Sequence, residues 1–177
     1  MTKQLWLIDD KDSGELSIDA VKAFIQELDE ANIEVRVNIL SNGGDIDFGN
    51  AIYDAVKAHP YLVTGVVYGA AASAGSYILQ ACDVRIMMPS ASLMIHHGTL
   101  KLNGEPLQVI EQAKKWKVDH FKFLNAYANR MKQSDKYSEA SLAKVRAQLY
   151  KKLQQFGDWR LTAGEALEEG LIDSIWE

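Results

Sequence analysis

The chain is poor in cysteine, with one, Cys82, among its 177 residues. A single cysteine cannot form an intrachain disulfide, and it cannot supply a cysteine-based zinc cluster. Disulfide-stapled secreted domains and cysteine-ligated zinc proteins are therefore excluded as classes. We expect Cys82 to be a small buried residue of a protein in the reducing cytoplasm.

Long apolar stretches are also missing. No run approaches the roughly 20 residues that a membrane-spanning helix needs. The N-terminal sequence MTKQLWLIDD lacks the apolar core of a signal peptide. We therefore expect a cytoplasmic protein without a membrane partner.

An excess of positive charge is the third absence. Lys and Arg number 19 against 24 for Asp and Glu, a formal net charge of −5. Lysines such as Lys114, Lys115 and Lys117 are mixed with carboxylates and form no basic block. A nucleic-acid partner is therefore not expected.

What the chain does contain is the pattern of a globular α/β domain. Hydrophobic residues make up 47% and charged residues 24%, as in an ordinary soluble domain, and the length favours one domain over residues 1–177. Strands are predicted at residues 4–8, 34–40, 62–68, 84–88, 92–95 and 171–176. Helices are predicted at residues 18–28 after an N-cap at Ser17, and at 45–58, 73–81, 105–131, 138–154 and 162–169. Strands that alternate with helices indicate a parallel sheet.

Three features stand where predicted strands end: the Gly43-Gly44 turn, Ser73 within GAAASAGSY, and His96. Ligand-binding groups of parallel α/β sheets gather at the carboxyl ends of the strands. We therefore expect these three features to share one site.

Serine-dependent acyl transfer needs a hydroxyl, a base that takes its proton and a group that orients the base. Ser73 offers the hydroxyl, His96 or His97 the base, and Asp158 the orienting carboxylate. Each also has an ordinary structural explanation, because a serine between strand and helix usually caps the helix. A histidine at a strand end is usually a satisfied polar residue, and Asp158 could be a helix-end or surface carboxylate.

The same chemistry needs backbone N–H donors for the oxyanion. Gly43 or Gly44, together with the N–H of Ala74, could supply them, because a glycine lets the backbone approach a substrate without a Cβ. A Gly-Gly pair is otherwise simply a turn.

The stretches SNGGD, AAASAG, LMIHH and GDWRLTAGEALEEGLID follow in this order. Together they resemble the proteolytic subunit of Clp-type proteases, from about Val35 to Ile175. The resemblance implies an α/β fold of the Clp protease/crotonase-like type, a spiral of ββα units with a protruding long helix. It also implies a serine endopeptidase without metal or organic cofactor. The implied catalytic residues are Ser73, His96 and Asp158, and the implied oxyanion hole comprises Gly43, Gly44 and Ala74.

The predicted helix at 105–131 carries two apolar faces. One comprises Val109, Ala113, Trp116, Phe123 and Tyr127, and the other Leu107, Ile110, Val118, Phe121 and Leu124. A surface helix needs only one. The resemblance implies a handle at about 101–134 that packs between rings, beside a head at about 1–100 and 135–177. We therefore expect a homo-oligomeric ring that cleaves polypeptides, with Trp116, Phe121 or Phe123 buried against another chain.

The sequence departs from the family pattern in three places. Asn42 stands where proline is common, and His97 stands where another polar residue is common, without an assigned role. Only some 40 residues precede the Gly-Gly turn, so docking to an ATPase ring is not expected. In this shortness the chain is similar to Clp-related head-maturation proteases of tailed phages. A non-catalytic ring or scaffold subunit and a crotonase-like thioester hydratase or isomerase are the alternative functions.

Overall fold

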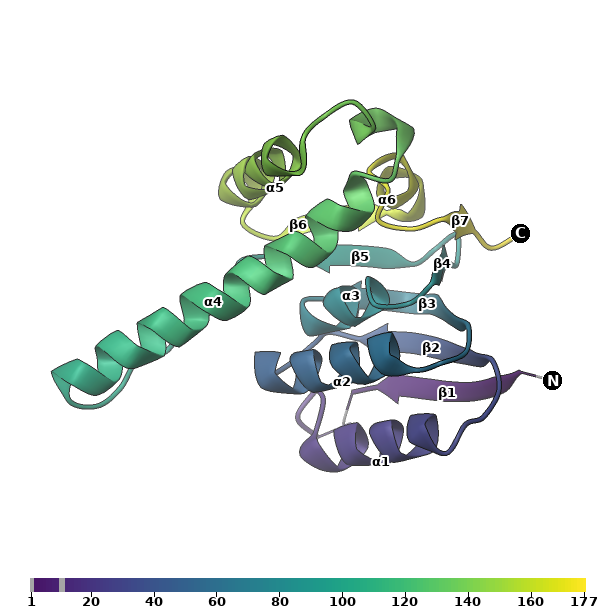
Figure 1. The fold of residues 1–177 in the computed structure, drawn as a ribbon, viewed down its shortest axis with the longest axis horizontal. Helices are drawn as coiled ribbons and strands as arrows, with labels where there is room; N and C mark the ends of the chain where they lie inside the picture. Colours follow the sequence, from purple (N-terminus) through teal and green to yellow (C-terminus); the bar gives the residue numbers. More distant parts are fainter. Residues whose placement is uncertain (1, 10–11) are drawn as a thin grey trace.

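The computed structural model describes residues 2–9 and 12–177. This part of the chain forms an α/β fold, with helices packed on a mostly parallel sheet, as the sequence predicts (Figure 1). The strands are β1 Lys3–Ile8, β2 Val35–Ser41, β3 Val63–Ala72, β4 Val84–Met87, β5 Ser92–Ile95, β6 Trp159–Thr162 and β7 Ser174–Ile175. The helices are α1 Ile18–Asp29, α2 Ile46–Ala58, α3 Ala74–Leu79, α4 Pro106–Met131, α5 Leu142–Phe156 and α6 Ala163–Glu168, with a 3₁₀ turn at Asp135–Tyr137.

Strand β3 organises the sheet because its two halves have different partners. In the part of the chain that is described, strands β1, β2, β3, β4 and β7 are neighbours in that order, all in parallel pairs. The carboxyl-terminal half of β3 leaves β4 and pairs in parallel with β5, which pairs with β6 in antiparallel. The sheet therefore turns at β3, and the ends of β2, β3 and β5 come together.

Helices α1, α2 and α3 follow one another along the sheet (Figure 1). Ser17 caps α1, since its hydroxyl accepts a hydrogen bond from Ala20 N–H at 3.2 Å. Val21, Phe24 and Leu28 are buried as their helical spacing predicts. Ile18 has the same helical spacing but is 51% exposed, because it occupies the first turn, at the edge of the packed face.

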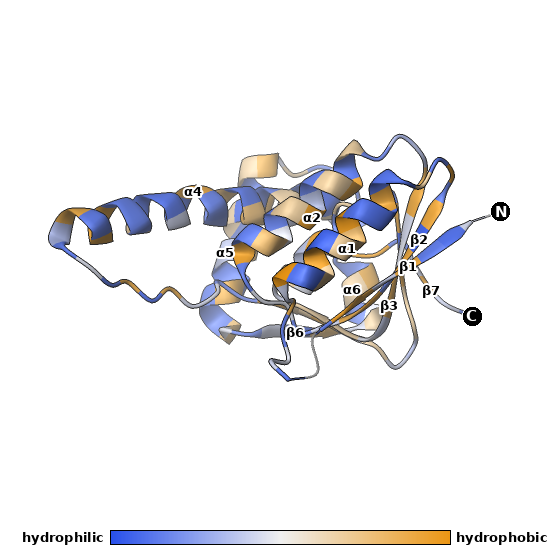
Figure 2. Cartoon of the chain, turned by 90° about the horizontal axis from the view of Figure 1, so that it is seen from below, coloured by the Kyte–Doolittle hydropathy of each residue, from blue (hydrophilic) through white to orange (hydrophobic). Residues whose placement is uncertain are grey.

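Helix α4 projects from the rest of the chain (Figures 1 and 2). Pro106 at its start and a capping box between Glu105 and Gln108 define its outer end. Near its other end, Phe123, Tyr127 and Met131 are buried in the core of the same chain. Of the three alternatives Trp116, Phe121 and Phe123 expected against another chain, Phe123 is already buried within its own chain, where it contacts Tyr77 and Tyr127.

Several predicted boundaries need correction. Strand β3 continues to Ala72 and does not end at residue 68, because Ala70, Ala71 and Ala72 pair with β5. Helix α5 begins at Leu142 and not at 138, because the Ser141 side chain accepts the N–H of Lys144. Strand β6 was not predicted, and the last strand is shorter than 171–176. The capping box of Thr162 and Glu165 and the helix stop at Gly170, with φ of 74°, are confirmed.

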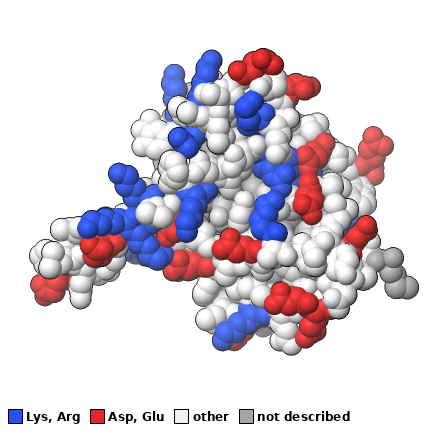
Figure 3. All heavy atoms as spheres, in the orientation of Figure 1, with Lys and Arg blue, Asp and Glu red and all other residues white. Residues whose placement is uncertain are grey.

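Three further findings bear on the expectations from composition. Cys82 is fully buried, as predicted. On the face shown in Figure 3, Lys and Arg side chains are interleaved with Asp and Glu side chains. Among the helices within residues 2–9 and 12–177, none combines the length and the apolar character that crossing a membrane requires.

Candidate active site

Ser73 lies at a sharp turn where β3 passes directly into α3. Its backbone has φ of 52° and ψ of −120°, and among the described residues it is the one non-glycine residue with positive φ. Such a conformation costs roughly 1–3 kcal/mol and persists only where surrounding contacts impose it. The Ser73 side chain makes no capping hydrogen bond to α3, so the ordinary explanation as an N-cap fails. Its hydroxyl lies instead at hydrogen-bond distance from His96, and nucleophilic serines of α/β-hydrolases are exposed on similar strained strand-to-helix turns.

Glycines allow the chain to close around this turn. A Cβ on Gly43 would lie 2.8 Å from Ala72 O, 2.8 Å from Ser73 Cβ and 2.9 Å from Ala74 N, and Gly43 has φ of 106°. A Cβ on Gly75 would lie 3.1 Å from Ser41. At both positions the Cβ would lie closer to its neighbours than an ordinary van der Waals contact. Neither position therefore accommodates a larger side chain unless the neighbouring atoms move. The close approach therefore depends on these glycines, while the alanines before Ser73 form part of the strand.

Strand register brings His96 and Asp158 to Ser73. Ala72 is paired with Met94 in the parallel β3–β5 ladder, so the residues just beyond the two strand ends are neighbours. Ile95 is paired with Trp159 in the antiparallel β5–β6 ladder, which places the next residue, His96, opposite Asp158. The three predicted residues, distant in sequence, therefore meet at one edge of the sheet.

The three side chains form a line of polar contacts. His96 Nε2 lies 2.8 Å from Ser73 Oγ, a hydrogen-bond distance, and His96 Nδ1 lies 3.4 Å from Asp158 Oδ1. The Asp158 side chain is 50% exposed and also contacts Arg160 Nη2 at 3.2 Å. With the Nδ1 proton directed at Asp158, Nε2 is left as the acceptor of the Ser73 hydroxyl proton. The arrangement can thus deprotonate a serine, with the carboxylate held less tightly than in a buried triad.

A buried hydroxyl pair supports the Ser73 turn from below. Ser76 Oγ lies 2.8 Å from the carbonyl oxygens of both Ser73 and Met94, and 2.6 Å from Tyr127 Oη. Burial raises the pKa of Tyr127 well above its usual value, so the phenol stays protonated and shares a hydrogen bond with the Ser76 hydroxyl. Sequence reasoning missed both residues. The helical spacing of Tyr127 indicated burial, but nothing in the sequence indicated its partner.

The backbone N–H groups around Ser73 differ in their availability. Gly43 N–H donates to Ser41 Oγ at 3.0 Å. Gly44 and Ala74 line the cavity beside Ser73. Ala74 is the first residue of α3, so its N–H has no carbonyl acceptor within the helix. The two residues that face the cavity are therefore better placed as oxyanion donors than Gly43.

The cavity beside Ser73 and His96 has a volume of about 680 Å³. Trp116, His120 and Phe123 of α4 form an aromatic wall, in which the Trp116 and His120 rings stack with centroids 4.7 Å apart. Asn42, Gly44 and Ala74 line it near the nucleophile. A cavity with one apolar wall and a few convergent polar groups suits the binding of a substrate side chain next to the reacting bond.

Comparison with known proteins bears on what this site does. A family model described as Clp protease matches residues 11–177. The ATP-dependent Clp protease proteolytic subunit 1 of Protochlamydia amoebophila (strain UWE25) is 30% identical over 179 residues, which cover 98% of this chain and 80% of the relative. The chain belongs to the Clp protease family. The predicted resemblance is confirmed, and the family is one of serine peptidases.

His97, which had no assigned role, contacts helices α4 and α5 of this Clp protease chain. Its Nδ1 lies 3.1 Å from His120 Nε2 on α4, and its ring packs on Tyr150 of α5. Burial, reinforced by the neighbouring His97, lowers the pKa of His120 to about 4. Burial also lowers the pKa of His97, with a further contribution from His96. The pair is therefore neutral near pH 7, with one ring donating to the other.

This pair predicts a stability that depends on pH. A histidine whose pKa is lowered by folding contributes stability that is present above the unfolded value of about 6.5 and declines as the pH falls toward the folded value. His120→Phe keeps a ring that can stack on Trp116 and removes the titrating group. We expect Tm of the wild type to fall relative to this variant, by about 2–4 °C between pH 7 and pH 5. A difference in Tm that stays constant across this range would contradict the prediction.

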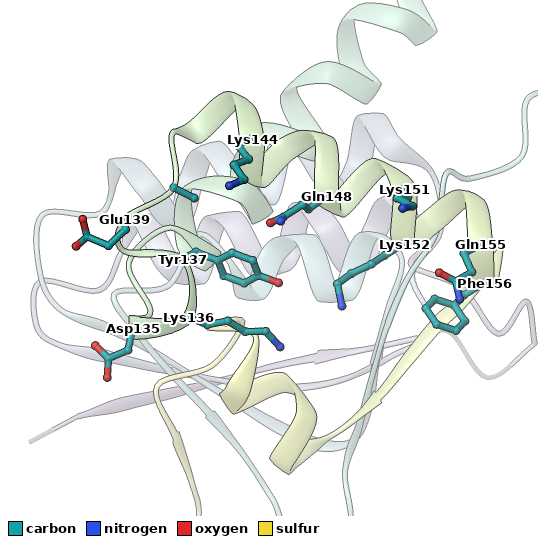
Figure 4. Close-up of a pocket in the computed structure, with 11 residues that line it drawn as sticks. Asp135, Lys136, Tyr137, Glu139, Lys144, Gln148, Lys151, Lys152, Gln155 and Phe156 are labelled. Atoms are coloured by element: carbon teal, nitrogen blue, oxygen red, sulfur yellow. The ribbon is translucent and has the colours of Figure 1, made fainter.

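A second cavity, of about 700 Å³, lies between α5 and the 3₁₀ turn (Figure 4). Among its described lining residues there is no serine, cysteine or histidine. Lys136 and Lys152 each donate to Glu169 at 2.9 Å, and Tyr137 Oη donates to the same carboxylate. Burial alone would raise the pKa of Glu169, but these hydrogen bonds outweigh it and the pKa is lowered. The cluster ties α5 and the 3₁₀ turn to the end of α6.

The described residues were also compared with the ligand arrangements of metal sites. Within the part of the chain that the structure describes, no three His, Cys, Asp or Glu side chains are arranged to hold a metal ion.

Proposed function

We propose that this Clp protease chain is a serine endopeptidase that cleaves polypeptides through Ser73, His96 and Asp158. The observation that carries the proposal is the 2.8 Å contact between His96 Nε2 and Ser73 Oγ at a strained strand-to-helix turn. The family assignment supports a peptidase over the crotonase-like hydratase or isomerase. A ring subunit without activity would have no need of the strained Ser73 turn.

In the proposed acylation step, Ser73 Oγ attacks the carbonyl carbon of the scissile peptide bond while His96 Nε2 takes its proton. The carbonyl oxygen becomes an oxyanion that accepts hydrogen bonds from Gly44 N–H and Ala74 N–H. The imidazolium then gives its proton to the departing amine, and the C–N bond breaks. Asp158 holds the Nδ1 proton and stabilises the positive ring during this step. The chemistry requires neither a metal nor an organic cofactor.

In the proposed deacylation step, a water molecule occupies the place of the departed amine. His96 Nε2 takes a proton from this water as its oxygen attacks the ester carbon. The second tetrahedral intermediate collapses, the proton returns to Ser73 Oγ, and the acid product leaves. The same two N–H donors stabilise both oxyanions, so one preorganised pair acts in both half-reactions.

The experiment that tests this function is reaction with a fluorophosphonate, read by intact mass and peptide mapping. We expect one adduct per chain, on Ser73, because the reagent needs an activated serine beside an oxyanion hole. Ser73→Ala is the control and should remain unlabelled. Labelling at another serine, or equal labelling of the Ser73→Ala chain, would overturn the assignment.

We further propose that residues 1–177 form one peptidase domain with a head and a handle that assembles into a homo-oligomeric ring. The proteolytic subunits of this family generally act as rings. The outer part of α4 exposes Leu107, Ile110, Val118 and Phe121, by 77%, 49%, 57% and 50%. Trp6, Ile8 and Leu40 are also exposed, by 52%, 47% and 42%, on the sheet face opposite Leu5 and Leu7. Parallel sheets are normally covered on both faces, so both surfaces favour burial against further copies of the chain.

The proposed assembly predicts that charged substitutions at two exposed apolar positions of α4 will disrupt it. Val118→Glu combined with Phe121→Glu is expected to dissociate the assembly, because large apolar subunit interfaces do not tolerate unpaired buried charge. Asn129→Glu, an exposed polar position on the same helix, is the control and should not dissociate it. The measurement is native mass spectrometry or light scattering at micromolar concentration. A fully active wild-type monomer of 19.8 kDa would contradict the proposed ring.

A further inference from the structure

We propose that Asp9 is a positioning residue that holds the glycine turn in the shape needed for oxyanion binding. This inference rests on the proposed peptidase function and concerns groups that do not contact the substrate. Asp9 follows β1, and the pairing of Ile8 with Leu40 places it beside Ser41, the last residue of β2. Its carboxylate therefore lies at the start of the turn that carries Gly43 and Gly44.

The Asp9 carboxylate accepts two hydrogen bonds from this turn. Ser41 Oγ donates to Asp9 Oδ1 at 2.5 Å, and Asn42 N–H donates to Asp9 Oδ2 at 2.6 Å. Both bonds are short, as charge-assisted hydrogen bonds are. Proline at position 42 could not make the second, because it lacks an N–H. The Asn42 peptide is thus fixed from outside the turn by the carboxylate.

Ser41 links the Asp9 carboxylate to the backbone of Gly43. Its hydroxyl proton is used by Asp9, so its oxygen is free to accept Gly43 N–H at 3.0 Å. Ser41 is 2% exposed and packs closely against Gly75 of α3, the helix that begins after Ser73. The carbonyl of Gly43 is held separately by Leu16 N–H at 3.0 Å. Both backbone polar groups of Gly43 are therefore engaged on the protein side.

The turn needs this external support because its residues are conformationally free. Gly43 and Gly44 have φ of 106° and 142°, values that glycine adopts readily but among many others. With the N–H groups of Asn42 and Gly43 engaged, the N–H of Gly44, a residue that lines the cavity beside Ser73, is the one proposed to bind the oxyanion. A change of about 1 Å in the position of a catalytic group can cost on the order of 100-fold in rate. Asp9 acts on the reaction through this geometry.

The experiment compares Asp9→Ala, Asp9→Asn, Ser41→Ala and the Asp9→Ala/Ser41→Ala double variant, with Asp29→Ala as the matched control. Asp29 ends α1 and is exposed, so its removal should leave activity unchanged. The amide of Asp9→Asn keeps the shape of the carboxylate but offers one acceptor oxygen in place of two. The assays are cleavage of a fluorogenic peptide and inhibition by a peptide boronate, which mimics the tetrahedral intermediate. Thermal unfolding reports whether each variant is folded.

We expect kcat of Asp9→Ala and Ser41→Ala to fall about 10- to 100-fold, a fraction of the loss caused by deleting an oxyanion donor. KM should stay within about twofold, and boronate affinity should fall by the same factor as kcat/KM. The double variant should be no worse than the poorer single variant, because both act on one chain of hydrogen bonds. Unchanged turnover in Asp9→Asn would overturn the proposal, since it would mean that the second acceptor oxygen is not needed. Faster turnover would overturn it too, since the negative charge would then merely oppose the oxyanion.

A second readout does not depend on catalysis. Hydrogen–deuterium exchange over residues 38–48, measured by mass spectrometry, should be faster in Asp9→Ala than in the wild type and in Asp29→Ala. If Ser73→Ala shows that the proposed nucleophile is wrong, this readout still tests the role of Asp9 in the turn. Exchange that is equal in all three proteins would overturn the positioning role even if the peptidase assignment holds.

Discussion

Ser73→Ala and His96→Ala are each expected to reduce peptidase kcat by about 10⁶-fold, because nucleophile and base act as a unit and either loss removes the covalent pathway. Ser73 Oγ and His96 Nε2 share one 2.8 Å contact, so neither side chain has a substitute partner at the same position. The measurement is the hydrolysis of a fluorogenic peptide under single-turnover and steady-state conditions. Activity above about a tenth of the wild-type value in a folded Ser73→Ala protein would remove Ser73 from the mechanism.

The controls for this prediction use matched residues away from the site. Ser174→Ala alters an exposed serine of β7, and His59→Ala alters the histidine that follows α2. Both should keep near-wild-type activity. Ser73→Gly gives a sharper test of the turn, because glycine adopts φ of 52° without the steric cost that serine bears. This variant should be inactive yet unfold at a temperature no lower than that of Ser73→Ala.

Asp158→Asn is expected to reduce kcat by about 10²- to 10⁴-fold, the upper value being the loss for a buried triad aspartate. The amide places an N–H opposite His96 Nδ1, which favours the tautomer with its proton on Nε2 and so blocks general-base action. We expect less than the upper value because the Asp158 side chain is 50% exposed and its distance to Nδ1 is 3.4 Å. Water can partly take over its role at such a position.

The comparison for this prediction is Asp54→Asn, an exposed position on α2 that should be neutral. Asp173 is unsuitable as a neutral control, because it forms a bidentate contact with buried Arg85 and its loss would destabilise the fold. A harmless Asp158→Asn substitution would mean that another group orients His96. Because Asp158 also contacts Arg160, the variant Arg160→Gln separates loss of the carboxylate from loss of its partner.

The sequence allowed prediction of the residues that stand at strand ends, because glycine, serine and histidine in those places are visible without knowledge of the pairing. Asp158 was one candidate among several explanations until the family resemblance selected it. Strand β6, which begins directly after it, was not predicted, since its four residues carry too short a pattern. The predicted strand ended at residue 68 because the following residues are glycine and alanine, which are uncommon in strands. Pairing with β5 extends β3 to Ala72 and overrides that local preference.

Long-range contacts were beyond sequence reasoning. The Ser76 hydroxyl meets Tyr127 across 51 positions of sequence, and Asp9 meets Ser41 across 32. Polar residues of this kind are common, and only the folded arrangement selects their partners. The two apolar faces of α4 were visible as periodicity, but periodicity does not say which face the chain covers itself. Phe123 is therefore buried, at 6% exposed, whereas Phe121, two positions away, is 50% exposed.

Because the two halves of β3 pair with different strands, the geometry of the candidate active site depends on correct strand register. Ser73, His96 and Asp158 meet only because β5 is aligned both with the end of β3 and with β6. A slip of one residue in β5 would carry His96 about 3.3 Å along the strand and turn its side chain to the other face of the sheet. A misaligned but compact chain could keep most of its apolar burial and still be inert. Catalytic activity therefore reports whether these strands are paired in the correct register, which a measurement of molecular size would not detect.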